Sequence, residues 1–183
     1  MAAEMTTRVL PGDARVDTRP MVRVDQAGEY GAARIYAGQL AVMGSRAPGS
    51  AVIARMKSQE QRHLDVFDRL ITERRVRPTL LGPLWHVAGY GLGVVTALIG
   101  PQAAMACTAA VETEIDAHYQ AQRDALGSDD PELAAHIADF QADEVEHKAT
   151  AIEHGAEGAF GYPLMSAVIR AGCRVAIAAT MRI

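Results

Sequence analysis

The feature that most constrains this 183-residue chain is a Glu-x-x-His pattern that occurs twice. It joins Glu60 to His63 and, in the second half of the chain, Glu144 to His147. Residues three apart share one face of a helix, so the carboxylate and imidazole of each pair can bind the same metal ion. Four-helix bundles with two metal ions take such a pair from each of two helices and a single Glu from each of the other two. The pattern therefore predicts two further glutamates.

Both glutamates are present at matching distances from the two pairs. Glu29 precedes Glu60 and Glu112 precedes Glu144 at sequence spacings that differ by only one position. The two halves of the chain thus repeat one helical hairpin, with Glu on its first helix and Glu-x-x-His on its second. A single Glu-x-x-His would be a weak signal, because both residues are common on solvated helices. Its duplication at nearly equal spacing favours a shared metal site.

Glu114 is an alternative to Glu112, because only two residues separate them. Two residues correspond to about 200° around a helix, so only one of these carboxylates can face the site. Tyr119 lies seven residues after Glu112 and on nearly the same face. We therefore expect Glu112 to be the ligand and Glu114 to point towards solvent. Glu146 is also expected to face away from the site.

Other polar residues are candidates for contacts around the ligands. His118 lies about 120° around the helix from Glu112, so it either approaches the site or lies at the surface. Asp25 and Asp143 each lie one turn before a predicted ligand, and either could hydrogen-bond a ligand imidazole. Exposed acids would look the same in the sequence. Beside Glu29, Gly28 and Gly31 would permit close helix approach.

Composition limits the class of protein. The length and the 49% hydrophobic content fit one domain with one core. A net charge of −4 without a dense Lys/Arg run argues against nucleic acid as a partner, because that would require a basic face. Cys107 and Cys173 lack metal-binding or C-x-x-C spacing and are expected to be reduced core thiols. Residues 1–19 have no apolar run, so we expect a flexible tail without a signal peptide, followed by a domain over 20–183.

The fold is predicted to be all-α. Aromatic residues make up only 5% of the chain and period-two alternation is scarce, whereas helix start and stop signals recur. We expect helices at about 20–44, 50–77, 80–99, 101–127, from 130 to between 155 and 158, and from 163 to the end. Short loops join the first helix to the second and the fourth to the fifth, so each pair should form an antiparallel hairpin, with the third helix crossing between the hairpins.

The long stretch from Leu80 to Val111 contains no Asp, Glu, Lys or Arg. It exceeds the ~20 residues that normally suggest a transmembrane helix. A single crossing, however, would place the two halves of the metal site on opposite sides of a bilayer. We therefore expect the helix at 80–99 to lie on, or dip into, one leaflet. The last helix agrees, because Arg170 and Arg174 alternate with apolar residues in a pattern suited to lipid headgroups. The alternative is burial in a core or a dimer interface.

A ligand set of four carboxylates and two histidines suits iron or manganese better than structural zinc, which prefers tetrahedral Cys/His sets. Six protein ligands shared by two ions leave open positions, and a reduced di-iron pair with open positions binds O₂. The reaction then depends on what reaches the site. Iron itself would indicate a ferroxidase, peroxide a manganese catalase and an organic molecule a hydroxylase.

Several segments together carry a family resemblance that runs from about residue 20 to the end. They are Asp25 to Ala32, Arg34 to Gln39, Glu60 with His63, Ala110 to Glu112 with His118 and Tyr119, Asp143 to His147, and Ala171 to Ile177. In these segments the chain resembles the demethoxyubiquinone hydroxylases of ubiquinone biosynthesis. Members of that family are membrane-bound, ferritin-like di-iron enzymes that hydroxylate the ring of a polyprenyl demethoxyubiquinol with O₂.

The resemblance implies a ligand set and a setting for the enzyme. The implied ligands of two iron ions are Glu29, Glu60, His63, Glu112, Glu144 and His147. His118 and Tyr119 match a His-Tyr pair implicated in substrate binding and electron delivery. We expect a ferritin-like four-helix bundle with two additional apolar, membrane-interfacial helices, peripheral on the cytoplasmic face of the cell inner membrane. NADH or the quinol itself is the expected reductant, and a lipid-binding accessory protein or a homo-oligomer is the candidate partner.

Two alternatives belong to other functional classes. A ferroxidase or iron-storage protein would use the same metal ligands, but storage calls for a soluble, shell-forming surface, against which the uncharged stretch at 80–111 argues. A non-enzymatic membrane scaffold would bind no metal, so metal content would distinguish it.

Overall fold

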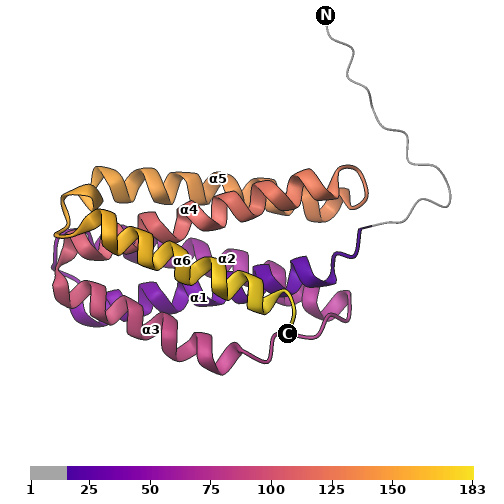
Figure 1. The fold of residues 1–183 in the computed structure, drawn as a ribbon, viewed down its shortest axis with the longest axis horizontal. Helices are drawn as coiled ribbons and strands as arrows, with labels where there is room; N and C mark the ends of the chain where they lie inside the picture. Colours follow the sequence, from indigo (N-terminus) through magenta and orange to yellow (C-terminus); the bar gives the residue numbers. More distant parts are fainter. Residues whose placement is uncertain (1–15) are drawn as a thin grey trace, which may run out of the picture.

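The structure is a computed structural model that describes residues 16–183. Within this range it contains six α-helices, a single turn of 3-10 helix and no strand, which confirms the all-α prediction. The elements are α1 (Arg19–Met43), α2 (Ser50–Glu73), α3 (Gly82–Ile99), α4 (Pro101–Leu126), α5 (Pro131–Glu153), η1 (Ala156–Gly158) and α6 (Tyr162–Thr180) (Figure 1). Of the tail expected at 1–19, residues 1–15 lie outside the described residues, and Arg19 already belongs to α1.

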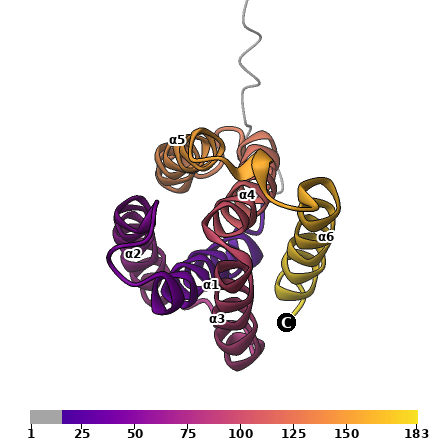
Figure 2. The same ribbon diagram turned by 90° about the vertical axis from the view of Figure 1, so that its left-hand side faces the viewer.

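Helices α1, α2, α4 and α5 form a four-helix bundle built from two antiparallel hairpins, as predicted. The α1–α2 loop spans residues 44–49 and the α4–α5 loop spans 127–130. Viewed end on, the other two long helices lie outside the bundle, α3 against α1 and α6 beside α4 (Figure 2). Asp130 caps α5 by accepting a hydrogen bond from the Leu133 amide at 3.1 Å, and Pro131 follows at a position where no amide hydrogen is needed.

The core of the bundle has two apolar clusters with a polar layer between them. The first cluster includes Tyr36, Ile53 and Met56, and the second includes Phe67 and Phe140. On α2, the first Glu-x-x-His pair falls between Met56 and Phe67 in sequence. The metal-site residues therefore occupy the middle of the bundle, where apolar side chains at both ends keep water away from them.

The uncharged stretch at 80–111 divides at Gly100, whose φ of 147° separates α3 from α4. On the α4 side, every residue from Ala103 to Glu112 is buried in the bundle. On the α3 side, only Gly93, Thr96 and Ala97 are buried. The stretch is therefore part core helix and part exposed apolar helix, two environments that a hydropathy profile does not distinguish.

Helix α3 packs directly on the backbone of α1. A Cβ atom added to Gly93 would lie 2.9 Å from the Ile35 carbonyl carbon, 3.0 Å from the Gln39 nitrogen, and closer still to the Ile35 carbonyl oxygen. A Cβ atom on Gly38 would lie 2.9 Å from the Val94 nitrogen. Only glycine fits at these two positions.

Gly28 and Gly31, for which we expected close helix contact, are in a different environment. A Cβ atom at either position would meet nothing within 4 Å. Both residues border an apolar cavity described below. Helix α3 does approach the Gly31 backbone closely, because a Cβ atom added to Gly89 would lie 3.0 Å from the Gly31 carbonyl oxygen. This packing, however, does not depend on the missing side chain of Gly28 or Gly31.

Glu114 connects α4 to α6 and does not point towards solvent, so that expectation is also wrong. Its side chain is buried, and Oε1 accepts hydrogen bonds from Arg170 Nε at 2.6 Å and from Arg174 Nη1 at 2.8 Å. Helix α6 covers the face of α4 on which Glu114 lies. The two arginines, expected to be free for lipid headgroups, are therefore paired with a carboxylate of the protein, although their side chains stay about half exposed.

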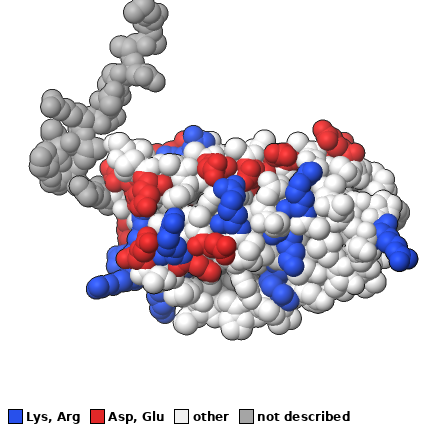
Figure 3. All heavy atoms as spheres, turned by 180° about the vertical axis from the view of Figure 1, so that it is seen from behind, with Lys and Arg blue, Asp and Glu red and all other residues white. Residues whose placement is uncertain are grey.

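Helices α3 and α6 are long and apolar enough to cross a membrane, judged by length and composition alone. Only 17% and 11% of their respective residues are buried, so neither is a core helix. Val87 and Leu98 on α3, and Leu164 and Val175 on α6, are among the exposed apolar residues. Seen from behind, the molecule carries charges of both signs, whereas its lower edge, where α3 lies in Figure 1, is largely uncharged (Figure 3).

Candidate metal centre

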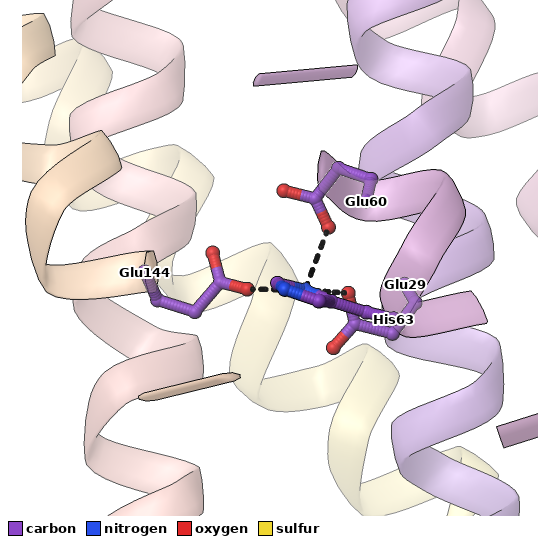
Figure 4. Close-up of side chains that lie close together, drawn as sticks. All are labelled: Glu29, Glu60, His63 and Glu144. Carbon is purple, nitrogen blue, oxygen red and sulfur yellow. Dashed lines mark hydrogen bonds and ion pairs between the residues drawn. The ribbon is translucent and has the colours of Figure 1, made fainter. Parts of the chain in front are cut away.

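The six predicted ligand side chains meet in the polar layer of the bundle, and none is more than 1% exposed. They form two overlapping groups, and within each group the ligand atoms lie within 4.8 Å of one another. The first group is Glu29, Glu60, His63 and Glu144 (Figure 4), and the second is Glu60, Glu112, Glu144 and His147. Glu60 and Glu144 belong to both groups and are therefore placed to bridge two ions.

The donor atoms in this layer fit cations. Among residues 16–183, the buried oxygens without a hydrogen-bond partner include both carboxylate oxygens of Glu60 and Oε2 of Glu112. Leaving ionised carboxylates buried without partners costs several kcal/mol per group, by the order of magnitude known for buried ions. The four glutamates together carry a formal charge that two divalent cations would balance. The residues present therefore fit a two-metal site.

Without bound cations, the surroundings of Glu60 and Glu112 disfavour the ionised form of their carboxyl groups. Burial raises the pKa of Glu60 well above its ordinary value, and the charges of Glu144 and Glu29 raise it further. Burial and the charge of Glu144 likewise raise the pKa of Glu112. Two bound cations would reverse these shifts, because they stabilise the charged form of each ligand.

The two histidines compensate part of the negative charge of the buried glutamates. Burial disfavours the charged form of Glu144, but hydrogen bonds with His147 and His63 outweigh burial and lower its pKa to about 2. Burial lowers the pKa of His63, but its hydrogen bonds to Glu144 and Glu29 dominate and raise the pKa to about 10. A histidine must be neutral to bind a metal, so metal uptake at this site is coupled to proton release.

The orientation of His63 identifies its ligand nitrogen. Nδ1 lies 3.2 Å from Oε1 of Glu144, 3.3 Å from Oε2 of Glu29 and 3.9 Å from Oε2 of Glu60. The ring also stacks on Phe140, with ring centroids 4.1 Å apart. This packing fixes the plane of the imidazole and leaves Nε2 pointing away from the three glutamates.

Each of the two single glutamates accepts a hydrogen bond from a tyrosine of the other hairpin. Tyr36 donates to Oε1 of Glu112 at 2.6 Å, and Tyr119 donates to Oε1 of Glu29. Tyr36 lies seven residues after Glu29, just as Tyr119 lies seven residues after Glu112. Tyr36 was not predicted from the sequence, although the spacing that pointed to Tyr119 also identifies it. The two tyrosines hold the predicted ligands in place from opposite sides.

Two further side chains contact the outer nitrogens of the histidines. His63 Nε2 lies 2.9 Å from Asp143 Oδ2, and His147 Nε2 lies 3.2 Å from Gln59 Oε1. Asp143 was a candidate partner for a ligand imidazole, and it contacts the histidine of α2 and not the one on its own helix. Gln59 was not identified from the sequence.

His118 lies outside the two ligand groups. Its Nε2 atom is 3.5 Å from Asp25 Oδ1 and 2.9 Å from Gln122 Nε2, and the residue borders a surface groove of about 600 Å³. Asp25 is buried, and burial raises its pKa to about 6. Asp25 was a candidate to bind a ligand imidazole, but the imidazole that it contacts is that of His118. Of the two catalytic candidates, only Tyr119 touches a predicted ligand.

An apolar cavity of about 430 Å³ lies between α1, α3, α4 and α6. It reaches Gly28 and Ala32, on either side of Glu29 in sequence, and its outer wall includes Trp85 and Leu92 of α3. Both cysteines are free thiols; Cys107 is buried in the core as predicted, whereas Cys173 is only partly buried and lines the cavity. The cavity thus extends along α1, the helix that carries Glu29, and its other walls are α4 and the two exposed apolar helices.

The sequence is similar to a group of hydroxylases over nearly its full length. Residues 17–180 match a family model described as ubiquinone biosynthesis protein COQ7. The 3-demethoxyubiquinol 3-hydroxylase of Rhodospirillum rubrum is 51% identical over 178 residues, which cover 95% of this chain and 83% of the relative. The mitochondrial NADPH-dependent 3-demethoxyubiquinone 3-hydroxylase of Homo sapiens is 50% identical over 161 residues, or 86% of this chain and 74% of the relative. The mitochondrial 5-demethoxyubiquinone hydroxylase of Saccharomyces cerevisiae is 43% identical over 179 residues, with coverages of 89% and 77%.

Proposed function

Because the chain belongs to the COQ7 family of ubiquinone biosynthesis proteins, we propose that it is a monooxygenase that hydroxylates the ring of a polyprenyl demethoxyubiquinol. Two iron ions are the proposed cofactors and O₂ the co-substrate. The observation that carries the proposal is the pair of buried ligand groups that share Glu60 and Glu144. When bound, the iron pair supplies the activation of O₂ that ring hydroxylation requires.

The residues of the chain position the reactants and exclude water. Tyr36 and Tyr119 hold the two single glutamates, so these carboxylates keep one orientation while their remaining oxygens bind metal. Asp143 and Gln59 fix the imidazole planes from outside. The apolar clusters above and below the layer keep bulk water out, which strengthens every charge interaction within the site.

The apolar cavity is the proposed binding site for the quinol ring and the first part of its tail. Its lining is carbon-rich and includes Gly28 and Ala32 of α1 and Val111 of α4, which belong to the helices that carry Glu29 and Glu112. A polyprenyl tail is too apolar to extend into water. The tail would therefore leave the cavity between α3 and α6, where exposed apolar side chains meet lipid.

Contact with one leaflet of the cell inner membrane, on its cytoplasmic face, is the proposed location. Val95 and Leu98 on α3 and Phe160 before α6 are exposed, and such residues lower their free energy by entering the acyl region of a membrane. A lipid-binding accessory protein or a second copy of the chain is the proposed partner. For the reductant, the human relative's description as NADPH-dependent favours a nicotinamide nucleotide over the quinol itself.

Metal analysis combined with product detection tests this function. The purified protein should bind about two irons per chain, and with O₂ and a reductant it should convert a short-chain demethoxyubiquinol into its hydroxylated product, detected by mass spectrometry. Glu144→Ala should lose iron and product while keeping its helical circular dichroism. Glu146→Gln is the matched control, because Glu146 lies on the same helix but is exposed.

Each outcome has a distinct meaning. If Glu144→Ala retained two irons and normal turnover, the ligand assignment would be wrong. If the wild type bound iron and oxidised excess Fe²⁺ but produced no hydroxylated quinol, the ferroxidase alternative would replace the proposal. That alternative provides no role for the apolar cavity or for the exposed faces of α3 and α6.

A further inference from the structure

The residue immediately before each Glu-x-x-His crosses the bundle to the histidine of the other hairpin. Gln59 precedes Glu60 and contacts His147, whereas Asp143 precedes Glu144 and contacts His63. The two positions are equivalent in the internal repeat of the chain, yet one provides a neutral amide and the other a carboxylate. The six predicted ligands thus repeat between the two halves of the chain, but the side chains that contact the two histidines differ.

Both histidines use the same nitrogen towards the centre. His63 directs Nδ1 at the carboxylates, and His147 Nδ1 lies 3.2 Å from both Glu60 Oε1 and Glu144 Oε2. A neutral imidazole that binds a metal through Nδ1 carries its proton on Nε2 and donates it outward. In the structure, His63 Nε2 lies 2.9 Å from a carboxylate oxygen and His147 Nε2 lies 3.2 Å from an amide oxygen, and each would donate to that oxygen when its Nδ1 holds a metal. The shorter contact is the one that an ionised acceptor gives.

Asp143 is itself held in position. Arg62 forms ion pairs with Asp143 and, at 2.9 Å, with Asp139, which lies one turn earlier on α5. The Arg62 guanidinium also lies over the Phe140 ring, 5.4 Å from its centroid. Arg62 thus links α2 to α5 and orients the carboxylate that faces His63.

We propose that Asp143 and Gln59 are positioning residues that make the two metal positions unequal, so that the ion held by Glu29 and His63 binds first and more tightly than the ion held by Glu112 and His147. The physical reason is that a carboxylate partner makes an imidazole a stronger donor to metal than an amide partner does. Partners of this kind typically change metal affinity by about 10- to 100-fold. The inference rests on the proposed metal centre.

Anaerobic titration with Co²⁺ in the presence of a competing chelator tests the inference without turnover. The visible absorption of bound Co²⁺ reports each binding step. The wild type should bind two ions in two steps whose dissociation constants differ by about 10-fold or more. Glu112→Gln should leave mainly the tight step, and Glu29→Gln mainly the weak step, which assigns each step to a position.

Two substitutions should each reduce the asymmetry, one by weakening the tight step and the other by strengthening the weak step. Asp143→Asn keeps the size of the side chain but removes its charge, and should weaken the first step until the two steps merge. Gln59→Glu adds a carboxylate opposite His147 and should strengthen the second step, a gain of affinity that general damage to the fold cannot produce. Glu146→Gln is the control, because Glu146 is exposed on the same helix as Asp143, and both steps should stay as in the wild type.

The outcomes separate this inference from the proposed function. If the wild type failed to bind two Co²⁺ ions, the metal centre itself would be wrong, and this inference with it. Two bound ions of equal affinity, or two steps that neither Asp143→Asn nor Gln59→Glu shifts, would overturn the asymmetry and leave the metal centre in place. Should Asp143→Asn not fold, Gln59→Glu and the two ligand variants still decide the question.

Discussion

Replacing Gly93 by alanine tests how closely α3 packs against α1. The added Cβ atom would lie 2.9 Å from the Ile35 carbonyl carbon and 3.0 Å from the Gln39 nitrogen. Favourable carbon contacts lie at about 3.5–4.0 Å, so α3 has to move away by at least about 0.6 Å. The backbone of α1 cannot adjust as a flexible side chain would, because each of these atoms belongs to a helical turn.

The magnitude follows from two opposing effects. Overpacking of a tight contact costs typically about 1–3 kcal/mol, and the upper end applies here because the clash involves backbone atoms. Alanine in a helix interior gains about 1 kcal/mol over glycine. The net loss is about 2 kcal/mol, which corresponds to about 4–8 °C in Tm for a chain of this size. Because α3 forms one wall of the apolar cavity, KM for the quinol should also rise.

Thermal unfolding followed by circular dichroism measures the effect. Gly91→Ala is the matched control, because Gly91 lies in the same helix and a Cβ atom there meets nothing within 4 Å. Its Tm should stay equal or increase, since only the gain in helix propensity remains. If Gly93→Ala were as stable as Gly91→Ala, α3 would not pack on α1 in the way described.

Three further predictions follow from the charged groups and the apolar surface. Burial raises the pKa of Asp25 from 3.8 to about 6, so the stability associated with its protonated form is complete below the unfolded value and is lost as pH rises through about 6. Asp25→Asn should therefore raise the free energy of unfolding, measured with urea, by up to roughly 3 kcal/mol at pH 8 and have little effect at pH 4. Equal effects at both pH values would show that burial of the ionised carboxylate is not the cause. Glu114→Gln should lower the free energy of unfolding by about 1 kcal/mol, a modest value because the arginine partners of Glu114 are half exposed. Glu146→Gln should change it by less than about 0.5 kcal/mol. Equal effects of the two substitutions would mean that α6 does not depend on this ion pair. Leu98→Asp should weaken liposome flotation by up to ~3 kcal/mol without changing metal content, while the cavity-lining variant Leu92→Asp should chiefly impair quinol binding; unchanged flotation for Leu98→Asp would place the membrane contact elsewhere.

The sequence alone determined the helices and the set of residues that could form the metal site. Helix boundaries follow from local chemistry, such as the Asp130 cap with Pro131 behind it, and these signals act within one or two turns. The duplicated Glu-x-x-His and the glutamates upstream of it could also be recognised in the sequence, because residues at helical spacing lie on the same face of a helix. The same spacing contained Tyr36, seven residues after Glu29, which the sequence analysis overlooked.

Only the tertiary structure decided which polar residues meet across the bundle. Glu114 is buried because α6, which is distant from it in sequence, lies over it and supplies two arginines. Asp25 contacts His118 and Asp143 contacts His63, pairings between helices that local spacing does not encode. Exposure and hydrogen-bond partners depend on which helix packs on which face, and that choice is made by burial summed over the whole chain. The helix boundary within the uncharged stretch at 80–111 was predicted from the sequence, but only the structure showed that the part of α4 in this stretch is core while α3 stays largely exposed.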